Sequence, residues 1–186
     1  KIIEEGNTTT SANVLFDILR KIPSGTDINF TLKSENKLSL KSQNSDFNLL
    51  CLPSSNFPTF DDKFEGEKIE IDKKRFLTML NKTKISISND DTRHYLNGIY
   101  LHATESNKNT FLTGVATDSH RLSSSSILVE NIKSFASIII PRKTVFQLCS
   151  LLDSVEEKLV IQANASKIKF SIGKIKLISK VIDGKF

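Results

Sequence analysis

The chain has 186 residues, of which 38% are hydrophobic and 25% charged, and its 26 Lys and Arg against 21 Asp and Glu give a formal net charge of +5. This length suits one large domain or one domain with part of another, and no apolar run resembles a secretory signal or reaches the length of a membrane span. Cys51 and Cys149 are the only cysteines, and with three scattered histidines they form no metal-ligand spacing, so we expect reduced thiols in a cytosolic protein and no metal.

Three segments repeat one pattern, in which a short extended run leads into a helix start signal and then into apolar residues at helical spacing. The start signals are Ser11, Asp72 and Pro141, residue types that favour an N-cap or the first turn of a helix. In each segment, apolar residues recur four, five, seven and eight positions after the start. The pattern predicts helices over Ala12 to Lys21, Lys73 to Lys82 and Arg142 to Leu152.

Each predicted helix is followed by runs of strand-forming residues between turn residues. The expected strands are 27–33, 37–42 and 46–52, then 95–103, 110–116 and 121–128, then 158–163, 167–172 and 174–182. The repeat is therefore βαβββ in an α+β protein, with one helix on antiparallel strands, unless three amphipathic helices are alike by chance. A stretch rich in Pro, Ser, Asn and Asp at 53–67 predicts a boundary after the first repeat.

Basic residues gather on the predicted helices, which carry three of the five arginines. One basic helix face is usually only solvated, but the same face on three equivalent units favours a single positive surface that contacts a phosphate backbone. Because no aromatic platform interleaves these faces, we expect neither base stacking nor sequence reading. The residues are Arg20 and Lys21, then Lys73, Lys74, Arg75 and Lys82, then Arg142 and Lys143.

The segment Gly114 to Leu122 places an acid, a hydroxyl, an imidazole and a guanidinium next to one another. Its composition suggests a hydrolase that uses Asp118, Ser119 and His120. If the preceding strand continues, however, Asp118 and His120 share one face and Ser119 points to the other. A Ser-His-Asp relay needs three converging side chains, so the rim of a binding pocket is the better interpretation.

The segments Tyr95 to Gly98 and Val115 to Leu122 resemble the middle domain of the bacterial DNA polymerase III beta subunit family, the sliding clamps. Supporting similarities follow in order at 15–20, 56–58, 140–143 and 179–186, so the resemblance covers essentially the whole chain. It implies that 1–62 is the second half of the family's N-terminal domain. It also implies that 63–186 is the middle domain, with halves at about 66–130 and 133–186, and that the third domain is absent from this chain.

The resemblance implies a DNA clamp fold, with antiparallel sheets outside and short helices lining the inner face of a ring. Its implied function is that of a processivity factor, which encircles duplex DNA without reading its sequence and performs no chemistry. The implied partners are duplex DNA and, through linear peptide motifs, the replicative polymerase, the clamp loader and repair polymerases. A cytoplasmic location, a homodimer at full length, no membrane and no cofactor are implied as well.

The resemblance also implies two sets of site residues. A peptide pocket would contain Leu96, Thr117, Asp118, Ser119, His120, Arg121 and Leu122. Ser119 stands where the family usually has glycine, which adopts positive φ more readily. DNA would contact Arg20, His94, Tyr95, Arg142 and Lys143.

Arg93 is interpreted as structural, paired with Asp90 or Asp91. Two other functions remain as hypotheses: a basic α+β module that binds DNA without encircling it, and the hydrolase that uses Asp118, Ser119 and His120.

Overall fold

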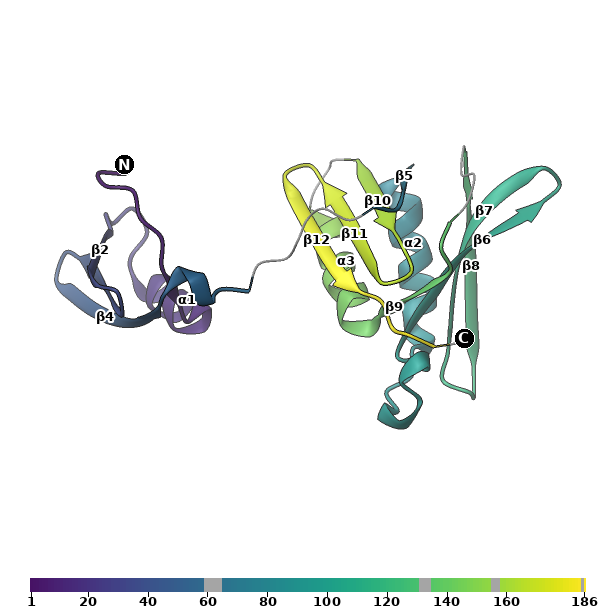
Figure 1. Cartoon of the computed structure of the whole chain (residues 1–186), viewed down its shortest axis with the longest axis horizontal. Coiled ribbons are helices and arrows are strands. Elements are labelled where there is room, and N and C mark those ends of the chain that lie inside the picture. Colours follow the sequence, from purple (N-terminus) through teal and green to yellow (C-terminus); the bar gives the residue numbers. More distant parts are fainter. Residues whose placement is uncertain (59–64, 131–134, 155–157, 185) are drawn as a thin grey trace. The chain divides into compact units, whose positions relative to one another are not determined.

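The computed structural model describes residues 1–58, 65–130, 135–154, 158–184 and 186. The chain forms two compact units, Lys1–Asp62 (unit 1) and Lys63–Phe186 (unit 2), both drawn in Figure 1.

Unit 1 contains one βαβββ repeat. Its elements are β1 (Thr9–Thr10), α1 (Ala12–Lys21), β2 (Asn29–Ser34), β3 (Lys37–Ser42) and β4 (Ser45–Leu52), followed by the 3-10 turn η1 (Ser54–Asn56). The strands form one antiparallel sheet in the order β1-β4-β3-β2. The helix begins at Ala12 because the Ser11 side chain accepts a hydrogen bond from the backbone N–H of Val14.

The core of unit 1 is small. Leu38, Leu49 and Cys51 of the sheet are buried, and Leu15 and Ile18 of α1 pack against them while remaining partly exposed. The helix therefore covers only part of its sheet.

Unit 2 contains two repeats. The first comprises β5 (Glu67–Ile71), α2 (Lys73–Thr83), the 3-10 turns η2 (Lys84–Ser86) and η3 (Asp91–Leu96), β6 (Gly98–Ser106), β7 (Asn109–Thr117) and β8 (Leu122–Val129). The second comprises β9 (Ile138–Pro141), α3 (Arg142–Ser154), β10 (Leu159–Ala163), β11 (Lys167–Ile172) and β12 (Ile175–Lys180). Asp72 caps α2 through a 2.8 Å hydrogen bond from the backbone N–H of Arg75.

The two repeats of unit 2 exchange their leading strands. One sheet has the order β8-β7-β6-β9 and the other β12-β11-β10-β5, so each leading strand pairs with the other repeat's first strand after the helix. Figure 1 shows β10 to β12 in one sheet and β6 to β8 in the other. A bridge between Ile139 and Ile182 also links β9 to the chain just after β12.

Helices α2 and α3 pack together and fill the space that these sheets share. Phe76 of α2 and Phe170 of β11 are fully buried, with ring centroids 6.2 Å apart. Leu80 and Leu148, one from each helix, are also fully buried in this core. Exchanged strands and a shared core make the two repeats one cooperative structure.

The α+β class and the three helices predicted from the sequence are confirmed. The predicted strand over 95–103 is wrong at its start, because η3 occupies Asp91–Leu96 and β6 begins only at Gly98. Asp90 explains the difference: its carboxylate accepts hydrogen bonds from the backbone N–H and the hydroxyl of Thr92, which favours a local turn over a strand. The strands predicted over 110–116 and 121–128 agree with β7 and β8 to within two residues at each end, and because β7 ends at Thr117, strand alternation does not extend to residues 118–120.

Candidate functional site

Residues 118–121 form the turn between β7 and β8. The Asp118 carboxylate accepts hydrogen bonds from the backbone N–H groups of His120 and Arg121 and is paired with the Arg121 guanidinium at 3.0 Å. The Arg121 bonds, the backbone one first, lower the pKa of Asp118 to about 2. The turn is thus shaped by a carboxylate that stays ionised throughout the neutral pH range.

Thr117 holds the other side of the same turn. Its hydroxyl donates to the carbonyl of Arg121 at 2.8 Å and accepts from the backbone N–H of Ser119 at 3.1 Å. Two of the predicted pocket residues, Thr117 and Asp118, therefore support the backbone that carries the exposed His120 and Leu122.

Ser119 has a φ of 75°, in the left-handed region that favours glycine. Its hydroxyl accepts a hydrogen bond from the Arg93 guanidinium, which also binds the Asp90 carboxylate through Nε at 3.0 Å. The pairing of Arg93 with Asp90 is confirmed, but the bond to Ser119 could not be predicted because it joins residues 26 positions apart. Hydrogen bonds from Thr92 and then Arg93 lower the pKa of Asp90 to about 2.

This bond connects the turn to η3, the element that carries Leu96. Leu96 is only 6% exposed, whereas Leu122 is 65% exposed. Ser86, in η2, and Ser123, at the start of β8, share a 2.7 Å hydrogen bond beside the turn. Leu122 therefore presents the larger apolar surface, and Leu96 is buried.

The predicted nucleic-acid residues of unit 2 lie on two adjoining elements. The backbone N–H of Arg142, at the start of α3, donates to the carbonyl of Asn97 at 2.8 Å, so the start of α3 adjoins the end of η3. His94 and Tyr95 lie on η3 with their rings edge to face, 6.1 Å apart. Lys143 is exposed on the first turn of α3.

Arg20, on α1 of unit 1, is exposed and lies 3.8 Å from Asp17. Its guanidinium also lies 5.9 Å from the ring centre of Phe16. The absence of aromatic residues from the basic faces, expected from the sequence, is not what the structure shows. Phe16 is 63% exposed, and Phe146 of α3 is 43% exposed beside Arg142.

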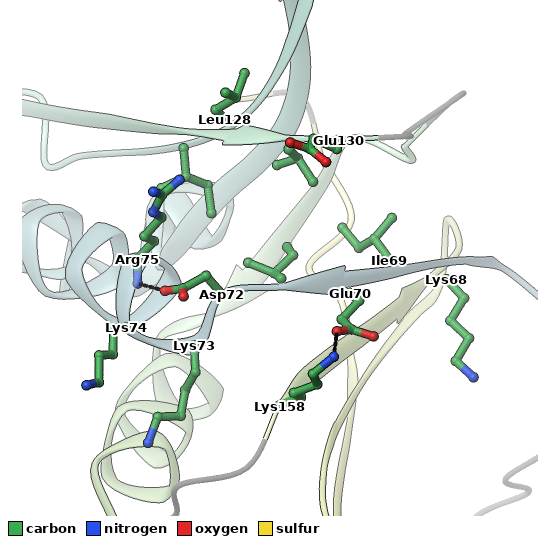
Figure 2. Close-up of a pocket in the computed structure, with 13 residues that line it drawn as sticks. Lys68, Ile69, Glu70, Asp72, Lys73, Lys74, Arg75, Leu128, Glu130 and Lys158 are labelled. Carbon is green, nitrogen blue, oxygen red and sulfur yellow. Dashed lines mark hydrogen bonds and ion pairs between the residues drawn. The ribbon is translucent and has the colours of Figure 1, made fainter.

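A larger depression, of about 850 Å³, lies between β5, the start of α2 and the end of β8 (Figure 2). In Figure 2 the ammonium of Lys158 reaches Glu70, and this ion pair measures 2.6 Å. Asp72 is engaged as the cap of α2. Its lining includes Lys73, Lys74 and Arg75, which belong to the basic helix faces predicted from the sequence, but none of the residues predicted for the peptide pocket or for DNA contact. The carboxylates of Glu70 and Asp72 already have partners.

The described residues also bear on the state of the cysteines, on metal binding and on membrane insertion. Cys51 and Cys149 are both buried free thiols, and burial raises the pKa of Cys149. Within the described ranges, His, Cys, Asp and Glu form no group of three suited to a metal ion. None of the helices described has the length and apolar character that crossing a bilayer requires.

Two βαβββ repeats with exchanged leading strands, helices packed together and a polar turn at one sheet end define a domain of the DNA clamp class. The chain matches the family model for the DNA polymerase III beta subunit, central domain, over residues 70–186. It matches the model for the N-terminal domain of that subunit over residues 1–61. The chain belongs to the DNA polymerase III beta subunit family.

Individual relatives agree with this assignment. The beta sliding clamps of Caulobacter vibrioides (strain NA1000 / CB15N) and Escherichia coli (strain K12) are each 34% identical over 183 residues, covering 97% and 98% of this chain and 49% of each relative. The solved structure of Caulobacter crescentus pol III beta superposes with a TM-score of 0.91 at 34% identity, covering 100% of this chain and 51% of that one. The chain thus spans about half the length of the relatives it matches.

Proposed function

We propose that the protein is a processivity factor of DNA replication, a sliding clamp that encircles duplex DNA and tethers a polymerase to it. The observation that carries this proposal is the central-domain match over residues 70–186, on a unit whose helix α3 opens with Arg142 and Lys143. In this proposal the clamp performs no chemistry, acts in the cytoplasm at the replication fork, and closes its ring as a homodimer at the length of its relatives.

The domain assignment is part of the same proposal. Residues 1–62 are the second half of the N-terminal domain, and residues 63–186 are the middle domain, with halves at about 66–130 and 133–186. The third domain lies outside this chain. Support comes from the order of the two family matches and from the single repeat in unit 1 against two in unit 2.

The proposed contact with DNA is electrostatic. Arg20, His94, Tyr95, Arg142 and Lys143 face the phosphate backbone, which presents the same charge at every step along the duplex. Exchange of one phosphate for its neighbour then costs little, so the protein moves along DNA without reading sequence. Binding should weaken steeply as salt rises, because each neutralised phosphate releases counterions.

The test is topological. A version of the protein that carries this chain at the length of its relatives is loaded onto nicked circular duplex DNA, and retention is measured before and after linearisation. Retention on circles with rapid loss from linear DNA is expected. Equal loss from both forms would refute encirclement and favour the non-encircling DNA-binding module.

The proposed peptide pocket uses the β7–β8 turn. Leu122, supported by Leu96 and the aliphatic stem of Arg121, receives an apolar anchor side chain of the peptide. His120 and the turn backbone, braced by Thr117, Asp118 and Ser119, bind the extended main chain. The partners are the replicative polymerase, the clamp loader and repair polymerases, each through a short linear motif.

Two double variants separate the peptide pocket from the DNA surface. His120→Ala with Arg121→Ala should weaken a Gln-Leu-x-Leu-Phe-type peptide at least tenfold, measured by fluorescence anisotropy, and leave duplex binding unchanged. His94→Ala with Arg142→Ala should do the reverse. If the first pair leaves peptide binding intact, residues 120 and 121 do not belong to the pocket.

The hydrolase hypothesis has no geometric support at the same turn. The Ser119 hydroxyl is bound by Arg93, and Asp118 accepts from the backbone N–H of His120. A Ser-His-Asp relay instead requires the acid to orient the imidazole and the imidazole to contact the hydroxyl. Loss of replication on changing Ser119→Ala, with the peptide pocket intact, would revive that hypothesis.

A further inference from the structure

The same helical position carries an exposed aromatic residue in both units. Phe16 and Phe146 each lie five residues after a helix start signal, at Ser11 and Pro141. In α3 the neighbouring positions of the helix point inward, since Val145 and Leu148 are fully buried. Phe146 lies outside that buried stripe and is 43% exposed. One exposed phenylalanine needs no explanation by itself, so its surroundings decide whether it matters.

Two cations flank the ring of Phe146. The guanidinium carbon of Arg142 lies 5.1 Å from the ring centre, and the ammonium of Lys84, from η2, lies 5.5 Å from it. The recurrence on α1, where Arg20 lies 5.9 Å from the ring centre of Phe16, shows that this pairing is not confined to one helix. Both sites combine a hydrophobic ring with positive charge at the surface.

The part of the chain that the structure describes offers the cations around Phe146 no carboxylate within ion-pairing distance. Among the described residues, no Asp or Glu oxygen lies within 4.0 Å of the side-chain nitrogens of Lys84, Arg142 or Lys143, whereas Arg20, Arg93 and Arg121 each have such a partner. A shallow depression of about 490 Å³ beside the ring is lined by Arg142, Lys143, Phe146, Gln147 and Ser150. Its lining is cationic, aromatic or neutral and polar, which complements a polyanion that also carries flat apolar groups.

We infer that Phe146, with Lys84 and Arg142, forms a binding site for unpaired bases of single-stranded DNA. This goes beyond the proposed clamp function, which needs only duplex phosphates, and rests on it for the placement of α3 toward DNA. Bases in a duplex are stacked on one another, so the ring finds no free base face there. An unpaired base has a free face that stacks on an aromatic ring or a guanidinium plane, while Lys143 and Lys84 neutralise its flanking phosphates.

The first experiment measures affinity with the 186-residue chain. Labelled oligothymidylate of about 15 nucleotides and a blunt duplex of equal length are titrated by fluorescence anisotropy. Phe146→Leu should weaken oligothymidylate binding about tenfold and change duplex binding less than about twofold, because only stacking is removed. Phe57→Leu is the matched control, since Phe57 is 62% exposed, and it should change neither affinity.

The second experiment keeps the inference testable if the leucine variant is altered in some other way. The chain contains no tryptophan, so Phe146→Trp introduces a single fluorophore at the site. Oligothymidylate should quench its emission and bind at least as tightly as to the unchanged chain, whereas the blunt duplex should not quench it. The control Phe57→Trp should remain unquenched by either DNA.

Three outcomes would overturn the inference. The first is an unchanged affinity of Phe146→Leu for oligothymidylate, and the second is an equal loss of affinity for oligothymidylate and for the duplex. The third is a loss of affinity only for a labelled oligoglutamate, which would identify an acidic protein partner instead. The clamp proposal stands or falls separately, on retention by circular duplex DNA.

Discussion

Helices α1 and α3 are built on the same pattern but differ in what they bury. All ten residues of α1 are described and none is buried, whereas Val145, Leu148, Cys149 and Leu152 of α3 are. The sequence periodicity of the two helices is alike. The difference comes from what covers them, since a second repeat packs on α3 and the structure describes no second repeat in unit 1.

The leading strands show the same contrast. In the described part of unit 1, β1 pairs only with β4 of its own repeat, through Thr9 and Thr10. In unit 2, β9 pairs with β6 of the other repeat along four residue pairs and also bridges to Ile182. A βαβββ repeat therefore completes its core by exchanging a strand with a second repeat.

The largest expected effect compares one position in two units. Phe76 and Leu15 both lie four residues after a helix start, but Phe76 is fully buried and Leu15 is not. Phe76→Ala should destabilise unit 2 by about 3–5 kcal/mol, because it leaves a cavity in a shared core. Leu15→Ala should cost unit 1 only about 1 kcal/mol.

Hydrogen exchange followed by mass spectrometry in increasing urea would report each unit separately for this pair. Comparable losses from the two variants would mean that the shared core contributes less than its burial indicates.

A second change acts on the exchanged strand itself. Gly98 begins β6, and a Cβ there would lie 2.2 Å from the carbonyl oxygen of Ile140 in β9. Gly98→Ala should therefore force β6 and β9 apart and cost about 1–3 kcal/mol. The control is Gly6→Ala in unit 1, where a Cβ would meet nothing within 4 Å. Thermal unfolding followed by circular dichroism should show a lower Tm for Gly98→Ala only. An unchanged Tm for that variant would show that β6 and β9 move apart to accept the added Cβ without a loss of stability.

A third change compares two of the hairpin turns of unit 2. The β7–β8 turn has Ser119 at φ 75°, and the β11–β12 turn has Gly173 at φ 55°. Gly173→Ser should destabilise unit 2 by about 1 kcal/mol, because a residue with a side chain is disfavoured by that amount in the left-handed region of φ and ψ. Ser119→Gly removes the same strain but also the bond to Arg93, so its net effect should stay below about 1 kcal/mol.

Chemical denaturation of both variants tests the turn comparison. Should Ser119→Gly be the more destabilising of the two, the Arg93 bond outweighs the backbone strain. Peptide affinity of Ser119→Gly would then show whether that bond also shapes the proposed pocket.

How much the sequence predicts depends on the range of the interactions involved. Helix α1 was predicted with its observed bounds because Ser11 and the apolar spacing are local signals. Periodicity does not indicate which sheet a leading strand joins, so the pairing of β9 with β6 could not be predicted from it. At the candidate site, the sequence itself indicated a pocket rim at Gly114 to Leu122, the family resemblance implied which of its residues bind a peptide, and their support by Arg93 is seen only in the structure.

The errors have a local cause as well. Strand propensity favours Tyr95 as part of β6. The Asp90 carboxylate instead accepts a hydrogen bond from the backbone N–H of Thr92 and so stabilises the start of η3. Phe16 and Phe146 were counted with the apolar stripe, although they lie at its edge and are exposed. Periodicity does not locate the edge of an apolar stripe to within one helical position.

The smallest expected effect is on the pH dependence of stability, and it compares the residues at one equivalent strand position in the two repeats of unit 2. His102 in β6 corresponds to Gln162 in β10, because each lies three residues along its strand from the residue paired with the position before a helix start signal, Ile99 opposite Ile140 and Leu159 opposite Ile71. The His102 ring stacks on Tyr100 at 4.6 Å, and its Nδ1 is buried without a hydrogen-bond partner among the described residues. Burial lowers the pKa of His102 from its usual 6.5.

A lowered folded-state pKa means that the unfolded chain binds a proton first as pH falls. The contribution of His102 to stability is therefore complete above pH 6.5 and decreases as pH falls through 6.5 toward the folded-state pKa. His102→Gln places in the first repeat the residue type that the second already carries, and it should flatten the dependence of Tm on pH between about 7.5 and 5.5. His94→Gln, at an exposed ring of η3, is the matched control for the replacement of a histidine by glutamine. If His102→Gln keeps the original slope, another group controls stability in this pH range.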